Sequence, residues 1–245
     1  MAKPAKSDRQ KVIDEIKKKQ KGADKRRGMM IVAVCVVIAL LIVGAAAYRP
    51  IKNWWDLRQF NDVDLASIGA AADVCEPVEE KASEGSNDHR TSGEQVPYED
   101  APPAFGPHWN DQDSPAPIKK RFYTDDERPE LESLVHNLEH GYTILWYDET
   151  IADDDDMLVQ IEGIAKKLDA SDSNFRFKFI AAPWTSDDEK EVAKFPEGQH
   201  IALTHWTGGD KSQGVWQYCS EPSGAALKTF MDDYPYTDSP EPNAM

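Results

Sequence analysis

The stretch "SLVHNLEHGYTILWY" (Ser133–Tyr147) places a short helix directly before a strand. Apolar residues in and just before it recur at i, i+3, i+4 and i+7, the spacing of one buried helix face. These residues are Leu131, Leu134, Val135 and Leu138. Gly141 is typical of a helix end, and the apolar, aromatic run after it is typical of a buried strand. The junction therefore predicts a helix that packs on a sheet.

Further elements follow from the periodicity on either side of this junction. We predict a strand at 141–148, a helix at 154–170, a strand at 175–184, a hairpin with strands at 200–206 and 214–219, and a closing helix at 223–234. This order predicts an α+β domain with a small mixed sheet. No C-x-x-C motif occurs in the sequence, which excludes a dithiol redox role of that kind.

A single uncharged stretch, Met29–Tyr48, is long enough to cross a membrane. As a helix it measures roughly 30 Å, the thickness of a bilayer core. Basic residues at 17–27 precede it, so the N-terminus is expected in the cytoplasm and the rest outside the cell membrane, with one pass. Trp54 and Trp55 fit the far membrane interface. The alternative is a signal peptide cleaved near Ala45–Ala47.

Composition divides the chain into six predicted segments. These are a basic cytoplasmic segment at 1–28, a transmembrane helix at 29–48, a juxtamembrane connector at 49–75, an extended strap rich in proline and acidic residues at 76–120, a globular α+β domain at 121–235 and a disordered tail at 236–245. The predicted fold class is thus α+β, with one N-terminal transmembrane helix followed by a small mixed-sheet extracytoplasmic domain.

Charge is distributed unevenly along the chain. The net charge is −16, but residues 1–28 stand at +7, so the other 217 residues stand at −23. An outer region this acidic repels a phosphate backbone, which argues against nucleic-acid binding. It suits a soluble, repulsive surface or one that meets basic partners.

The three cysteines fall into two classes. Cys35 lies within the apolar stretch, which leaves Cys75 and Cys219 in the outer region. Two cysteines in an oxidising compartment favour a disulfide, and this one would tie the start of the outer region to the segment before its last helix. Free thiols are the alternative.

The histidines raise the question of a metal site. His136, Glu139 and His140 form an H-x-x-E-H pattern, which some zinc peptidases use. A peptidase also needs a third ligand and an open cleft. Glu221 is the only carboxylate that can be nominated, and Gly141 ends the helix too early. We therefore do not expect a catalytic site.

A metal site without catalysis is more plausible than a peptidase. His108, on a loop rich in proline and glycine, can fold over the helix end and complete a three-histidine site with His136 and His140 for zinc or copper. The interpretation that the sequence favours over this metal site is that His136 and His140 cap the last helical turn, where a cation is favoured, and that His108 hydrogen-bonds the backbone. His200 and His205 alternate with apolar residues and are expected to be structural.

Two motifs carry a resemblance to a known family. "VPYEDAPPAFGPHW" (Val96–Trp109) and "VHNLEHGYTILWY" (Val135–Tyr147), after one basic-flanked span, resemble a family of membrane-anchored actinobacterial proteins of unknown function. The resemblance covers roughly residues 70–235. The matching positions are His108, Asn137, Glu139, His140 and Gly141. The family usually has Thr-Ser where this chain has Ala104-Phe105, so a hydroxyl contact is lost here.

The resemblance also implies a setting. A chain of this size and layout looks like an accessory subunit of the actinobacterial cytochrome bcc–oxidase respiratory supercomplex. It implies integral membrane respiratory subunits as partners and a cytochrome c domain as a possible neighbour. We therefore expect a non-catalytic, single-span protein without a cofactor. The alternatives are an extracytoplasmic zinc- or copper-binding or hydrolytic protein, and a ligand-binding envelope module.

Overall fold

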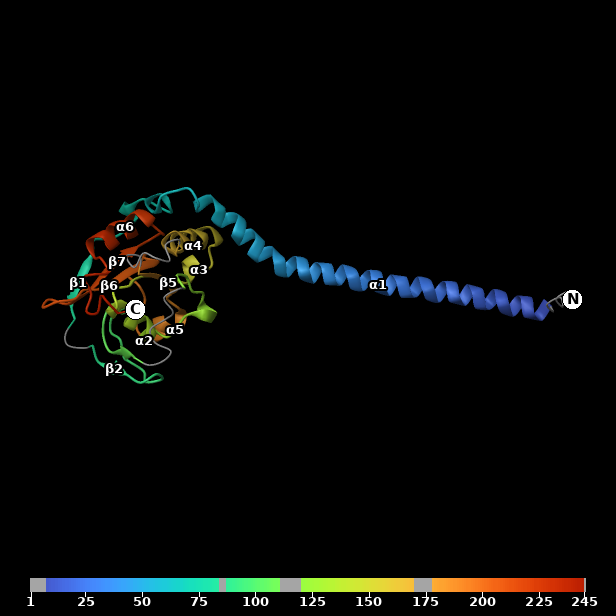
Figure 1. Cartoon of the computed structure of the whole chain (residues 1–245), viewed down its shortest axis with the longest axis horizontal. Helices are drawn as coiled ribbons and strands as arrows, with labels where there is room; N and C mark the ends of the chain where they lie inside the picture. The colour runs from blue at the N-terminus through green and yellow to red at the C-terminus, as the bar shows by residue number, and fades with distance from the viewer. Residues whose placement is uncertain (1–7, 84–86, 111–119, 170–177, 245) are drawn as a thin grey trace. The chain divides into compact units, whose positions relative to one another are not determined.

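The computed structural model describes residues 8–83, 87–110, 120–169 and 178–244, which form two compact units, 1–55 and 56–245 (Figure 1). The first unit is the long helix α1 (Asp8–Asp56). Its most apolar 18-residue window has a mean hydropathy of 3.1 and is 0% buried within the chain. By length and composition, this helix can cross a membrane. Trp54 and Trp55 near its end are both exposed.

The second unit is built on a five-stranded sheet. Its strands are β1 (Glu79–Ala82), β4 (Thr143–Tyr147), β5 (Phe179–Pro183), β6 (Ile201–Trp206) and β7 (Gln213–Cys219). The strand order is β1-β7-β6-β4-β5. Strands β4 and β5 are parallel, and the other pairs are antiparallel. The predicted mixed sheet is therefore confirmed.

Helices cover both faces of this sheet. They are α2 (Leu131–Glu139), α3 (Glu149–Ala152), α4 (Asp155–Asp169), α5 (Ser186–Glu191) and α6 (Gly224–Asp233). Strand β4 sends Ile144 and Trp146 into a core shared with α2, and Leu145 and Tyr147 into a second core shared with α4 and α6. Figure 1 shows α2 on one side of the sheet and α4 and α6 on the other. Because both faces are buried, β4 is an unbroken apolar run.

The sequence analysis places the start of the globular domain at residue 121. In the structure, the second compact unit begins at residue 56. Three short 3-10 helices, η1 (Leu57–Phe60), η2 (Leu65–Ser67) and η3 (Ala72–Val74), belong to it. Ile68 beside η2 is 1% exposed. Strand β1, within the predicted strap, pairs with β7 at the sheet edge. Composition does not reveal this, because an edge strand is held by backbone hydrogen bonds and β1 has no apolar face.

The predicted disordered tail is also ordered as far as Ala244. The backbone N–H of Glu241 donates to the carbonyl of Glu139 at 2.9 Å, and Ser239 is buried. The tail is held by backbone and polar contacts, as β1 is, and apolar composition therefore does not reveal it. Smaller elements that sequence did not predict are α3, α5, η4 (Asp125–Glu127), and the parallel pair β2 (His89–Arg90) and β3 (His108–Trp109). Positions 170 and 175–177 of the predicted elements lie outside the described residues.

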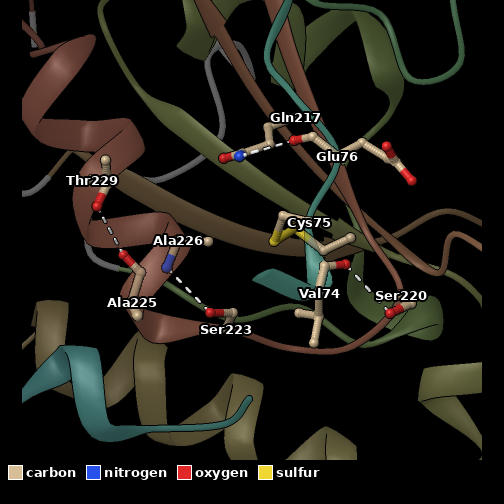
Figure 2. Close-up of a disulfide and its surroundings, with 10 residues drawn as sticks. Val74, Cys75, Glu76, Gln217, Ser220, Ser223, Ala225, Ala226 and Thr229 are labelled. Atoms are coloured by element: carbon tan, nitrogen blue, oxygen red, sulfur yellow. Dashed lines mark hydrogen bonds between the residues drawn. A yellow bond between two sulfur atoms is a disulfide. The ribbon is translucent and has the colours of Figure 1, made fainter. Parts of the chain in front are cut away.

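A disulfide joins Cys75 to Cys219 (Figure 2). Two hydrogen bonds flank it. The Ser220 hydroxyl donates to the Val74 carbonyl at 3.3 Å, and the Gln217 amide donates to the Glu76 carbonyl at 3.1 Å. The bond therefore ties the segment after η3 to the end of β7.

Candidate metal centre

The polar side of α2 holds the main cluster of chemically active side chains. The apolar side of this helix packs on the sheet through Leu134, Val135 and Leu138. All nine of its residues are buried, so its polar side chains are buried as well. Buried charged groups require partners, and His136 and Glu139 find theirs in the segment that carries β2 and β3.

Strands β2 and β3 bring two further histidines to this helix. Their parallel register places His89 opposite His108, and the two ring centroids are 4.9 Å apart. The His108 ring also lies 4.9 Å from that of His136. Residues separated by up to 47 positions thus meet through one short strand pair.

The fully buried His108 is oriented by the backbone. Its Nδ1 lies 2.9 Å from the carbonyl oxygen of Gly106, to which a protonated Nδ1 donates. An imidazole with a single proton, on Nδ1, has its lone pair on Nε2, the form in which it binds a metal. The loop is fixed in turn by Tyr98, whose hydroxyl donates to the Pro107 carbonyl at 2.7 Å.

Glu139 lies at the centre of the cluster and is 0% exposed. Its Oε2 is 2.9 Å from Nε2 of His108 and 3.5 Å from Nε2 of His89. Nε2 of His108 has no hydrogen bond of acceptable geometry among the described residues, although Oε2 of Glu139 is close to it. The other oxygen of Glu139, Oε1, also has no such hydrogen bond among these residues. Two ligand atoms that each lie about 2 Å from one zinc ion are about 3 Å apart. The spacing between His108 and Glu139 therefore fits two ligands of one ion.

The protonation states also suit metal binding. Burial, with the neighbouring His140 and His108, lowers the pKa of His136 to about 4. Burial alone would raise the pKa of Glu139, but its contacts with His108 and His89 outweigh that effect, and the pKa is lowered. At neutral pH the site thus holds a neutral imidazole beside an ionised carboxylate, both of which bind a cation.

Four ligand atoms, one each from His89, His108, His136 and Glu139, lie within 4.8 Å of one another. The structure therefore brings together His108 and His136 of the predicted trio. His140 lies beside His136, at 4.4 Å between ring centroids, but its ligand atom belongs to a second group with Glu139 and Glu241. The metal itself stays a prediction.

Two members of the cluster were missed by sequence reasoning. His89 lies in a polar stretch with no motif, and only its pairing with His108 reveals its role. Glu139 was considered as part of a peptidase pattern and of the family motif, but it was not predicted to be a metal ligand. Glu221, nominated as a third peptidase ligand, belongs to neither group of possible ligands among the described residues.

The other two histidines have different surroundings. His200 Nδ1 lies 2.7 Å from Asp148 Oδ2. His205 is fully buried, with its ring nitrogens 3.2 Å from the Tyr142 carbonyl and 2.7 Å from the Asp238 carbonyl. Burial lowers the pKa of His205. Both residues thus hold loops and strands together.

Ala104 and Phe105 pack against the core of the sheet. Ala104 is 0% exposed. Phe105 makes an edge contact with Trp216, at 6.1 Å between centroids, and it covers Gly214, where an added Cβ would lie 2.4 Å from the ring. This apolar packing holds the segment of Ala104 and Phe105 on the sheet.

Comparison with known proteins gives one match. A family model described as "Protein of unknown function (DUF3105)" matches residues 89–245. The matched range begins at His89 and includes every member of both ligand groups. No curated protein and no solved structure matches the chain.

Proposed function

We propose a function for this chain, which belongs to the DUF3105 family of proteins of unknown function, from its buried histidine and glutamate cluster. The chain is a single-span membrane protein whose outer domain binds a transition-metal ion. The ligands are His89, His108, His136 and Glu139. The family description assigns no activity, so the proposal is supported by the chemistry of the site.

One observation carries the proposal. The buried Nε2 of His108 and the buried Oε2 of Glu139 lie 2.9 Å apart without a well-formed hydrogen bond from the ring. One ligand atom each of His136 and His89 lies within 4.8 Å of both atoms, so one ion among them can contact all four residues. A cation at that point neutralises the buried carboxylate and binds the lone pair of His108.

The ligand set favours zinc. Three imidazoles and one carboxylate are typical zinc ligands, and four protein ligands are typical of a closed, structural site. Copper(II) also accepts such ligands but prefers a tetragonal geometry. His89 is the most accessible ligand, with its side chain 42% exposed, and is the natural point of metal entry. The centre holds the segment of β2 and β3 on α2, and no catalytic step is proposed.

Metal content of the purified full-length protein tests the proposal. We expect stoichiometric zinc, measured by elemental analysis after removal of loosely held metal. His108→Ala and His136→Ala should each weaken zinc binding by more than about 100-fold, beyond the loss typical of residues that only orient a ligand. His200→Gln is the matched control and should retain the metal. A wild-type protein that holds neither zinc nor copper would refute the proposal.

The membrane topology forms part of the same proposal. We assign Met29–Tyr48 as the span, with the basic segment in the cytoplasm and residues after the span outside. The long apolar helix supports a span, and the basic flank supports this orientation. Protease added to intact spheroplasts should remove the outer domain and spare an N-terminal tag.

A second candidate function is that of an accessory subunit. Its support is the uncovered apolar surface of α1, which includes Leu40, Leu41 and Ile42, each more than 60% exposed. Such a surface suits either lipid or other membrane helices. Under this proposal the chain docks on integral subunits of a cytochrome bcc–oxidase supercomplex, beside a cytochrome c domain.

Purification in mild detergent through an N-terminal tag tests this second candidate. This tag avoids the C-terminal tail, which packs beside the metal cluster. The purified fraction should show haem absorption from b- and c-type cytochromes. Recovery of the chain alone, without haem, would exclude the accessory role and would leave the metal site unaffected.

A further inference from the structure

A second group of possible ligands adjoins the first. Glu139, His140 and Glu241 each offer a ligand atom, and these atoms lie within 4.8 Å of one another. Nε2 of His140 is 3.6 Å from Oε2 of Glu241. Glu139 is common to both groups. The H-x-x-E-H pattern thus places its two histidines in different groups, with the glutamate shared between them.

The two oxygens of Glu139 have different surroundings. Oε2 is the atom that approaches His108 and His89. Oε1 is buried and has no hydrogen-bond partner among the described residues. A buried carboxylate oxygen without a partner is unfavourable. The ion of the proposed centre accounts for Oε2 and leaves Oε1 available to a second cation, which the second ligand group can hold.

Backbone contacts place Glu241 at this site. Its N–H donates to the carbonyl of Glu139 at 2.9 Å. The ammonium group of Lys178 donates to the His140 carbonyl at 2.7 Å and to the carbonyls of Pro242 and Ala244 at 3.1 and 2.7 Å. These bonds pin the C-terminal tail to the end of α2 at Glu241 and just after it. The carboxylate of Glu241 is therefore delivered by the tail, independently of its contact with His140.

Gly141 allows this close approach. Its φ is +88°, and an added Cβ would lie 2.3 Å from the carbonyl oxygen of Tyr236 in the tail. Only glycine accommodates both the backbone angle and the contact. The residue that ends α2 thus also admits the segment that carries Glu241.

From these contacts, and on the basis of the proposed metal centre, we infer that the site is dinuclear and that Glu139 bridges its two ions. The first ion is bound by His89, His108, His136 and Glu139 Oε2. The second is bound by Glu139 Oε1, His140 and Glu241. Ions in such pairs are about 3.5–4 Å apart. The second ion has only three protein ligands, so it keeps a position for water or another small ligand.

A plain ion pair between His140 and Glu241 is the alternative. The Glu241 side chain is 49% exposed, and an exposed pair of this kind contributes little. That reading explains the 3.6 Å contact but leaves the buried Oε1 without a partner. The dinuclear reading accounts for both observations.

Counting ions in the full-length protein tests the inference. The chain is stripped of metal with a chelator, loaded with cobalt(II) and dialysed, and bound cobalt is measured per chain. Wild type should hold two ions, and Glu241→Gln and His140→Asn should each hold one. Glu197→Gln removes an exposed carboxylate outside both groups and should hold two. Circular dichroism melts of the loaded proteins show whether each variant is folded.

Every outcome of this experiment is informative. One ion in wild type refutes the second site and leaves the single centre in place. No ion refutes the proposed function as well. Two ions in a folded Glu241→Gln protein refute the assignment of that residue. A loss of both ions in folded Glu241→Gln would refute the division into two groups that each hold one ion.

Discussion

Two glutamates on α2 respond to burial in opposite ways. Burial raises the pKa of Glu132, and the hydrogen bond from the Val96 N–H offsets this only in part. The pKa of Glu139 is lowered, because two histidines contact it. Both residues hold the strap against the helix, Glu132 through the backbone of Val96 at 3.0 Å and Glu139 through side chains. The fold thus favours the protonated form of Glu132 and the ionised form of Glu139.

The raised pKa of Glu132 leads to a prediction on pH. Its stabilising contribution is fully present below its unfolded pKa of about 4.5 and is lost as the pH rises through the higher folded value. Glu132→Gln keeps the acceptor for Val96 and stays neutral. The variant should melt at a higher temperature than wild type at pH 7, and the difference should disappear as the pH falls to about 4.5.

Glu197→Gln is the control for this prediction. Glu197 is exposed in the loop before β6 and does not contribute to the pKa of Glu132, so the variant removes the same charge from solvent rather than from a buried site. Its effect on the melting temperature should lack the loss at low pH. A Glu132→Gln difference that is equal at pH 4.5 and pH 7 would contradict the argument.

Contacts between elements depend on residues without side chains. Helix α4 carries Gly163 on the face that meets Phe60 of η1, and an added Cβ there would lie 2.4 Å from the phenyl ring. Phe60 is 9% exposed, so it anchors the connector on the helix. The close packing of the connector on α4 thus depends on the absence of a side chain at Gly163.

Gly163→Ala should therefore destabilise the outer unit. Alanine is favoured over glycine in a helix by about 1 kcal/mol, but overpacking at a filled contact typically costs about 1–3 kcal/mol. We expect a net decrease in the free energy of unfolding, measured by denaturant titration. Gly28→Ala, in α1 with no atom near the added Cβ, should not decrease it. Stabilisation by Gly163→Ala would mean that the ring moves freely.

At the scale of the whole molecule, the outer unit is larger than the region that matches the family. The unit begins at residue 56, whereas the match begins at residue 89. The intervening residues supply η1, η2, η3 and the edge strand β1. The disulfide between Cys75 and Cys219 links this added part to the matched part across 144 residues.

Loss of this disulfide should have a large effect. In the chain-entropy model a loop of this length stabilises the fold by ~4–5 kcal/mol. We expect Cys75→Ser with Cys219→Ser to lower the free energy of unfolding of the outer unit by about that amount. Cys35→Ser, which removes the exposed free cysteine of α1, is the control. If wild type under reducing conditions unfolds as it does when oxidised, the bond does not stabilise the unit.

The sequence by itself determined the elements whose signals are local. Each of these signals lies within one element. Periodicity reveals the apolar stripe of α4, and composition reveals the apolar run of β4 and the uncharged stretch of α1. H-x-x-E-H also marked the helix that carries the cluster. Only the tertiary structure decided which residues join that helix. His89 and Glu241 reach it through a strand pair and a backbone-anchored tail, and such long-range backbone contacts leave no periodic trace in the sequence.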